Sequence, residues 1–143
     1  MNALTIFYTD DDEDDLSIFS DAVKAIQKEL RLHTFDQPEK FLRALKNPPP
    51  TPNLVFLDLN MPGKNGLEVL QEIRNSDSHK KTPVVIFTTT SDSLTIKMCK
   101  AYGANYFITK PLSMQALIAS VEHALKIDWE KFVPSLSEFV YRP

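Results

Sequence analysis

The chain has 143 residues, of which 43% are hydrophobic and 24% are charged, a balance typical of one folded globular domain. The formal net charge is -3, and the absence of a basic stripe argues against direct nucleic-acid binding. No apolar stretch is long enough to cross a membrane, so no membrane contact is expected.

The first half of the chain alternates between strand and helix patterns. Residues 4–9 are predicted to form a strand, and apolar side chains then recur at helical spacing over residues 16–26. Residues 30–35 alternate between apolar and polar types, which is typical of a half-exposed strand. A short helix is predicted to open at residues 37–39 and to end before the prolines of residues 48–52.

The next two units repeat this order. Residues 54–57 form a continuous apolar run that predicts a third strand, and the following helix is expected to start near Asn65. Residues 83–87 predict a fourth strand. Ser91 is the expected N-cap of the helix after it, which should stop at Gly103.

The fifth unit completes the fold prediction. Residues 106–109 read as a strand, and apolar residues from Leu112 to Leu125 are expected to face the core from a final helix. Strict alternation predicts an α/β fold, a doubly wound (βα)5 parallel sheet with helices on both faces. The second strand alternates whereas the first, third and fourth are mostly apolar, so we expect the second at an edge and the flavodoxin-like order 2-1-3-4-5.

Polar residues follow four of the predicted strands where each strand ends. Because the carboxyl ends of parallel strands meet at one edge of a sheet, we expect these side chains to converge, and they are Asp10, Asp11, Asp58, Thr88 and Lys110. Clustered carboxylates repel one another unless a cation lies between them. Few ligands, all of them oxygen, favour Mg²⁺, with Asp11 and Asp58 as direct ligands. Asp58 is also a candidate nucleophile toward phosphorus.

At these positions the chain resembles the receiver domain of two-component response regulators. The resemblance is carried by the acidic pair after the first strand, by Asp58 within residues 57–63, by Thr88, and by Lys110 followed by Pro111. It covers about residues 4–127, so we expect a receiver domain over residues 1–127. We therefore interpret the chain as a stand-alone, single-domain receiver whose phosphodonor is a sensor histidine kinase or a phosphotransfer protein.

The resemblance implies a role for each pocket residue. Asp58 would be the phosphoacceptor, and the Mg²⁺ ligands would be Asp11, Asp58, the backbone carbonyl of Asn60 and, through water, Asp10. The resemblance also implies that the protein is not an enzyme with a separate substrate, because a receiver catalyses only its own phosphorylation and dephosphorylation.

The resemblance further implies a conformational switch. Thr88 would bond a phosphoryl oxygen, Lys110 would pair with the carboxylate, and the Lys110-Pro111 bond is expected to be cis. The aromatic residue Phe107 would turn inward behind Thr88 and reshape the surface of the fourth helix and fifth strand for an unknown downstream protein. Thr89 stands where a small residue is common, and we hypothesise that it lengthens the lifetime of the phosphoryl group.

Several alternatives remain at this stage. A haloacid-dehalogenase-like phosphatase also uses an aspartate at a strand end, but its motif needs a second aspartate where this chain has Asn60. A phosphorylation-independent interaction module is a third possibility. Residues 12–15 are interpreted as a solvated acidic turn at a helix start. His33, His79 and His123 share no ligand spacing, so packing or surface roles are expected for them.

The remaining features concern location and the last sixteen residues. The first nine residues lack a basic start and Cys99 has no cysteine partner, so we expect a cytoplasmic protein. Residues 128–143 form an apolar C-terminal extension, and the capping-box pattern of residues 135–138 predicts one short helix. This segment is expected to pack on its own domain, with a homodimer contact as the alternative.

Overall fold

The computed structural model describes residues 3–143, so the first two residues of the expected domain lie outside the described part. Five parallel strands form one sheet in the order β2-β1-β3-β4-β5, which confirms the predicted α/β architecture and strand order. Their bounds are β1 (Leu4–Thr9), β2 (Leu30–Phe35), β3 (Leu54–Leu57), β4 (Val84–Thr88) and β5 (Tyr106–Thr109).

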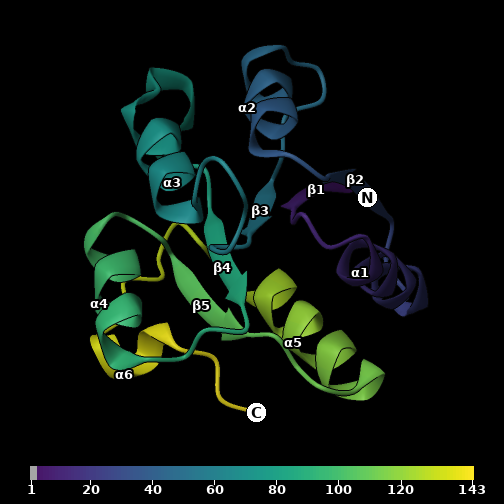
Figure 1. Cartoon of the computed structure of the whole chain (residues 1–143). Helices are drawn as coiled ribbons and strands as arrows, with labels where there is room; N and C mark the ends of the chain where they lie inside the picture. The colour runs from purple at the N-terminus through teal and green to yellow at the C-terminus, as the bar shows by residue number, and fades with distance from the viewer. Residues whose placement is uncertain (1–2) are drawn as a thin grey trace.

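Helices cover both faces of the sheet, as Figure 1 shows. The helices α1 and α5 lie together on one face, and α2, α3 and α4 lie on the other. Among the helices of the described residues, none is both long enough and apolar enough to cross a membrane. Their bounds are α1 (Glu13–Ala25), α2 (Pro38–Lys46), α3 (Gly66–Asn75), η1 (Asp77–His79), α4 (Ser93–Ala101), α5 (Met114–Lys126) and α6 (Leu136–Phe139).

The core consists of two apolar layers, one on each side of the sheet. Every residue of β3 and β4 is buried, which explains why both strands read as continuous apolar runs. The layer under α1 and α5 contains a group of aromatic rings, among them Phe19, Phe56 and Phe87, whose centroids lie 5.0 to 6.0 Å apart. Burying each such side chain contributes roughly 1.5 to 3 kcal/mol, so the central strands form a rigid platform.

Two helix starts differ from the sequence prediction. The N-cap of α4 is Asp92 instead of Ser91, because its carboxylate accepts hydrogen bonds from both the backbone N–H and the hydroxyl of Thr95. The expectation that Leu112 faces the core is wrong, because α5 begins at Met114 behind its cap Ser113. Leu112 therefore precedes the helix and is fully exposed.

Arg74 organises the amino-terminal end of the sheet from the last turn of α3. Its guanidinium donates to the backbone carbonyls of Gly103, His79 and Thr82 and to the side-chain oxygen of Asn105, at 2.8 to 3.1 Å. These four acceptors are uncharged and belong to the loops that lead into β4 and β5. Burial lowers the pKa of Arg74, but all three of its side-chain nitrogens donate to these acceptors.

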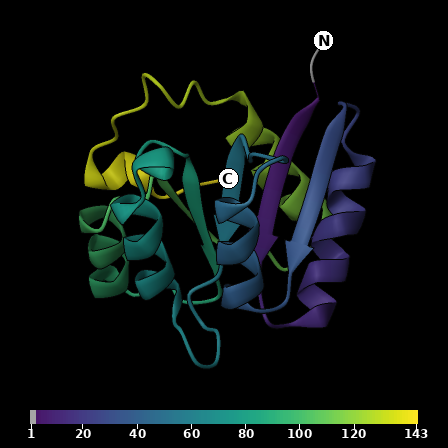
Figure 2. The same cartoon turned by 90° about the horizontal axis from the view of Figure 1, so that it is seen from above.

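The segment after α5 returns to the sheet. It passes the amino ends of the strands and enters α6 beside α4 (Figure 2). Ser135 and Glu138 form a capping box at the start of α6, the pattern predicted from the sequence. Val140 then forms a parallel bridge with Phe107 of β5, so this segment packs on its own domain.

Candidate phosphoacceptor and metal site

Three carboxylates meet at the carboxyl edge of the sheet. Asp10 follows β1 and Asp58 follows the neighbouring β3, and the backbone N–H of Asp58 donates to the carbonyl of Thr9. One oxygen of each of Asp10, Asp11 and Asp58 lies within 4.8 Å of the others. Asp10 is 0% exposed and Asp58 is 3% exposed, whereas Asp11 faces solvent. The predicted convergence of these acids is therefore present.

Lys110 brings an ammonium group to this cluster from the end of β5. Its ammonium lies 2.7 Å from Asp10 Oδ2, 2.7 Å from Asp15 Oδ2 and 3.6 Å from Asp58 Oδ2. The Lys110-Pro111 bond is not cis as expected, since the cis bonds of the described residues are at Pro48-Pro49 and Pro49-Pro50. Lys110 is placed instead by these carboxylates and by its backbone N–H, which donates to Thr88 O at 2.8 Å.

The surroundings change the protonation of the cluster. Burial, followed by the neighbouring charge of Asp10, raises the pKa of Asp58 from 3.8 to about 6. Burial lowers the pKa of Lys110, but hydrogen bonds from its ammonium to Asp10 and Asp15 outweigh this effect and raise it overall. The Tyr8 hydroxyl donates to Asp10. The site thus holds more negative charge than one ammonium neutralises.

Hydrogen bonds tie the loop after β3 to the end of β4. The side-chain amide of Asn60 donates to the hydroxyl oxygens of Thr88 and Thr90, each at 3.3 Å. The backbone N–H of Asn60 donates to Asp58 Oδ1 at 3.4 Å. Thr88 is fully buried, whereas its neighbour Thr89 is exposed. Thr88 therefore stands at the pocket, and Thr89 lies on its solvent side.

Gly66 allows α3 to start directly against the backbone of the site. A Cβ atom at this position would lie 2.4 Å from the Asp58 carbonyl oxygen and 2.7 Å from Leu59 Cα, distances that exclude any side chain. The backbone N–H of Gly66 donates to Leu59 O at 3.0 Å. This close approach holds the Asp58 backbone rigidly at the end of β3.

The oxygen cluster fits a divalent cation. Its candidate ligands are all oxygen atoms, two are buried, and the third, Asp11, is open to solvent. Mg²⁺ prefers a few carboxylates and keeps several waters, which matches this combination of buried and exposed ligands. The donor set contains no thiolate or imidazole, so it does not suit a zinc site.

Three residues at or next to the site were not predicted as functional. Asp15 is only half-buried and bonds Lys110, so it is not the freely solvated residue that the sequence interpretation made it. Its signal was available, since it lies four residues before the buried Phe19 and therefore on the sheet-facing side of α1. Thr90 bonds Asn60, 30 positions away, which a linear pattern does not reveal, whereas Tyr8 bonds Asp10 only two residues further on.

Phe107 lies away from the carboxylates, on the face of β5 that packs toward α3 and α4. It is 0% exposed, and its ring centroid lies 6.3 Å from that of Phe139 of α6. Phe107 pairs in register with Ile86 on β4, two residues before Thr88. The predicted switch residue is therefore buried under the C-terminal segment.

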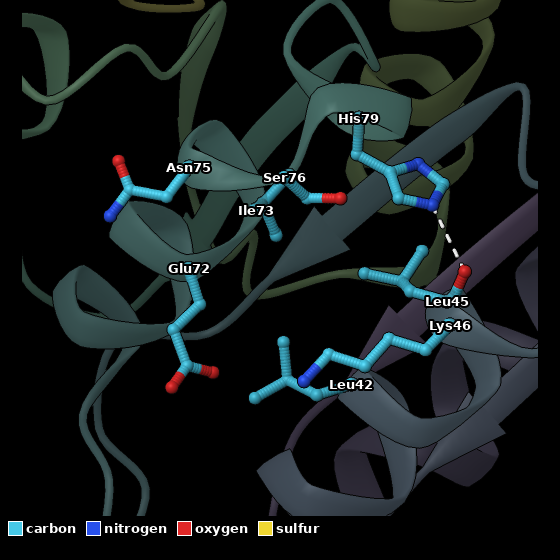
Figure 3. A pocket seen from close by; sticks show the side chains of 8 residues that line it. All are labelled: Leu42, Leu45, Lys46, Glu72, Ile73, Asn75, Ser76 and His79. Atoms are coloured by element: carbon cyan, nitrogen blue, oxygen red, sulfur yellow. Dashed lines mark hydrogen bonds between the residues drawn. The ribbon is translucent and has the colours of Figure 1, made fainter.

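A separate hollow of about 290 Å³ lies between α2 and α3 (Figure 3). None of the predicted site residues lines it, and three of its eight lining residues are apolar, namely Leu42, Leu45 and Ile73. His79 at its rim bonds the Leu45 carbonyl through Nε2 and the Thr82 hydroxyl through Nδ1. His79 thus has the packing role expected from the sequence.

Comparisons with known proteins point to one family. A family model described as the response regulator receiver domain matches residues 6–122. The response regulator Rcp1 of Synechocystis sp. (strain ATCC 27184 / PCC 6803 / Kazusa) is 37% identical over 73 residues, which are 51% of this chain and 50% of Rcp1. The uncharacterized transcriptional regulatory protein YkoG of Bacillus subtilis (strain 168) is 41% identical over 75 residues, 52% of this chain and 32% of YkoG. The matches span half or less of these curated relatives.

Solved structures show the same fold. The Mn²⁺-bound form of Rcp1 matches with a TM-score of 0.76 and 25% identity, covering 92% of this chain and 99% of that one. The phosphorylated cyanobacterial phytochrome response regulator RcpA matches with a TM-score of 0.78 and 25% identity, covering 93% of this chain and 98% of that one.

Proposed function

The chain belongs to the response regulator receiver domain family, and on this basis we propose that it accepts a phosphoryl group on Asp58 in the presence of Mg²⁺. The observation that carries this proposal is the cluster itself. A buried Asp58 carboxylate lies within 4.8 Å of two further acids and 3.6 Å from the Lys110 ammonium. The arrangement places several carboxylate oxygens around one candidate nucleophile, Asp58, and next to one cation, the Lys110 ammonium.

The transfer follows from these positions. An Oδ atom of Asp58 attacks phosphorus while the bond between phosphorus and the donor's imidazole nitrogen breaks, and the imidazole takes up a proton. The Lys110 ammonium and the Thr88 hydroxyl then donate to phosphoryl oxygens. Asp10, Asp11, Asp58 and the Asn60 carbonyl would hold the Mg²⁺, which neutralises charge on the phosphoryl oxygens when bound.

Loss of the group uses the same atoms. Water attacks phosphorus, the bond to the Asp58 oxygen breaks, and the carboxylate is restored. We propose that Thr89, exposed beside the buried Thr88, narrows the approach of this water. The protein then acts as a phosphoacceptor that catalyses its own reactions and turns over no separate substrate.

Partners follow from the proposed reaction. The phosphodonor would be a sensor histidine kinase or a phosphotransfer protein. The downstream partner would be a protein that binds the surface of α4 and β5. We propose that Thr88 and Phe107 change the shape of this surface on phosphorylation. We propose a cytoplasmic location, in keeping with the unpaired Cys99, which is buried.

The test is intact-mass analysis after incubation with acetyl phosphate and Mg²⁺. We expect one phosphoryl adduct in the unmutated chain, none in Asp58→Asn, and strong reduction when EDTA replaces Mg²⁺. Asp36→Asn is the matched control, because Asp36 also follows a strand, β2, but is partly exposed and paired with Lys40. An adduct that survives in Asp58→Asn would overturn the assignment.

A second assay separates this function from the phosphatase alternative. Asn60 stands where a haloacid-dehalogenase-like enzyme needs a second aspartate, and its amide donates to Thr88 and Thr90. We therefore expect stoichiometric labelling by acetyl phosphate without catalytic turnover of para-nitrophenyl phosphate. Sustained turnover that disappears in Asp58→Asn would favour the phosphatase.

A further inference from the structure

Residues 135–143 lie along the outer edge of β5, and we call them the C-terminal cover. Val140 forms a parallel bridge with Phe107, and the backbone N–H of Tyr141 donates to the Phe107 carbonyl at 2.8 Å. Since β5 is an edge strand of the sheet, the cover satisfies a backbone group that would otherwise be open to solvent or to another strand. Figure 1 shows α6 of the cover against α4.

Side chains attach this part of the chain to both faces of β5. On the face toward α4, Phe139 is 0% exposed and its ring packs against Phe107. On the opposite face, Tyr106 is surrounded by the rings of Trp129, Phe132 and Tyr141, with centroids 5.6 to 6.5 Å away. The strand is therefore enclosed by residues that follow α5.

The same strand ends in the candidate site. Lys110 directly follows β5 and places its ammonium among Asp10, Asp15 and Asp58. Only two residues separate Lys110 from Phe107, whose carbonyl and ring hold the cover. A displacement of Lys110 thus acts on a four-residue strand that pairs with β4 on one side and contacts the cover on the other.

The cover itself is held by few interactions. Its helix α6 has four residues, and a single turn is not stable without tertiary contacts. Leu136 is 41% exposed, so Phe139 is the one large apolar side chain of α6 that is fully buried. Segments with so few buried contacts open at low free-energy cost compared with the core.

From these contacts we propose that residues 135–143 are an intramolecular cover of β5 that loosens when Asp58 is phosphorylated. This inference rests on the proposed function. A phosphoryl group on Asp58 draws the Lys110 ammonium away from Asp10 and Asp15 toward the new oxygens. The resulting shift along β5 disturbs the packing of Phe107 against Phe139 and the bond from Tyr141. A downstream partner would then find the β5 edge accessible only in the phosphorylated protein.

Coupling of this kind is reciprocal. If phosphorylation weakens the cover, then weakening the cover must favour the phosphorylated conformation by the same free energy. Beryllium trifluoride allows this to be measured at equilibrium, because it binds reversibly to an aspartate as a phosphoryl mimic. Phe139→Ala removes the buried ring, and Leu136→Ala is the matched control because it truncates an exposed apolar residue of the same helix.

The test uses the full chain and hydrogen exchange measured by mass spectrometry on peptides that contain residues 138–142. We expect exchange there to become about tenfold faster after acetyl phosphate and Mg²⁺, with no change in Asp58→Asn. The phosphoryl adduct is quantified by intact mass in the same sample. An adduct with unchanged exchange overturns the coupling alone, whereas the absence of any adduct overturns the proposed function and the coupling with it.

The two variants provide an independent measurement. We expect Phe139→Ala to exchange rapidly without phosphorylation and to bind beryllium trifluoride with Mg²⁺ about threefold to tenfold more tightly than the unmutated chain, while Leu136→Ala behaves like the unmutated chain. Circular dichroism establishes that both variants are folded. Equal affinity in folded Phe139→Ala and Leu136→Ala would overturn the proposal and leave α6 as static packing.

Discussion

The two ends of the sheet hold partly buried charge in opposite ways. At the amino end, the Arg74 guanidinium donates to four uncharged oxygen atoms from its three nitrogens. At the carboxyl end, Asp10, Asp11 and Asp58 crowd within 4.8 Å of one another beside a single ammonium. The first arrangement stabilises the loops around it. The second is unfavourable in isolation and becomes useful when a cation and a phosphoryl group arrive.

Replacing Arg74 should produce the largest loss of stability. Arg74→Met keeps an apolar stem but leaves the carbonyls of Gly103, His79 and Thr82 without their donor. Because each lost hydrogen bond to this charged donor lowers stability, we expect the free energy of unfolding to fall by about 3 kcal/mol. Urea denaturation measures this value, with the exposed Arg43→Met of α2 as the matched control. Equal stability of the two variants would contradict the stabilising role of Arg74 at the amino end of the sheet.

Replacing Asp58 should instead increase the free energy of unfolding. Because the pKa of Asp58 is raised to about 6 from 3.8, the folded chain binds more protons than the unfolded chain between these values. Ionised Asp58 therefore lowers stability, and the penalty grows as pH rises from about 4 and is complete above about 6. Without divalent cations we expect Asp58→Asn to be more stable by about 1 to 2 kcal/mol at pH 7.5.

The pH dependence of that difference is the check. Denaturation at pH 7.5 and at pH 4 should show the advantage of Asp58→Asn shrinking at the lower pH, with Asp36→Asn showing no comparable advantage at pH 7.5. A variant that is less stable than the unmutated chain at pH 7.5 would contradict the account of the carboxyl end.

Adding Mg²⁺ should offset the repulsion among the carboxylates at the carboxyl end of the sheet. A cation that binds only the folded state at several times its Kd stabilises it by about 1 kcal/mol. We expect a rise of the melting temperature in the unmutated chain and little rise in Asp11→Asn. Asp14→Asn changes another exposed acid nearby and should keep the response. Equal responses in the two variants would place the ion elsewhere.

The smallest expected effect lies at the rim of the site. Thr89 is exposed and adjoins the buried Thr88. We expect Thr89→Ala to lose its phosphoryl group about twofold to fivefold faster, equivalent to less than about 1 kcal/mol in the barrier. The decay of the adduct after removal of acetyl phosphate measures this rate. Equal or slower decay would count against a role of Thr89 in limiting water.

Much of the architecture and the convergence of the acids was predictable, because both depend on periodicity and on strand ends. Continuous apolar runs mark β3 and β4, and strand ends place Asp10 and Asp58 side by side once the sheet is parallel. The misses concern tertiary contacts. The sequence places Asp15 on the sheet-facing side of α1, but it does not show that its partner is Lys110, 95 positions away, or that Phe139 packs against Phe107.

Competition between neighbouring residues for the N-cap position explains the errors at the helix starts. Ser91 and Asp92 are both good N-caps, and Asp92 is used because its carboxylate also accepts from the Thr95 hydroxyl. Leu112 looks like a core residue by type, but Ser113 caps α5 after it. The cis bond implied by resemblance at Lys110-Pro111 is absent, while Lys110 still reaches the cluster. The domain boundary near residue 127 stays a prediction.

The most direct test of the central claim locates the phosphoryl group within the sequence. Reduction of an acyl phosphate by borohydride converts the modified aspartate to homoserine, which peptide mass spectrometry identifies by position. After acetyl phosphate and Mg²⁺ treatment, we predict homoserine at position 58 and aspartate at positions 10 and 11. Homoserine at position 10 or 11, or aspartate at all three positions, would contradict the account.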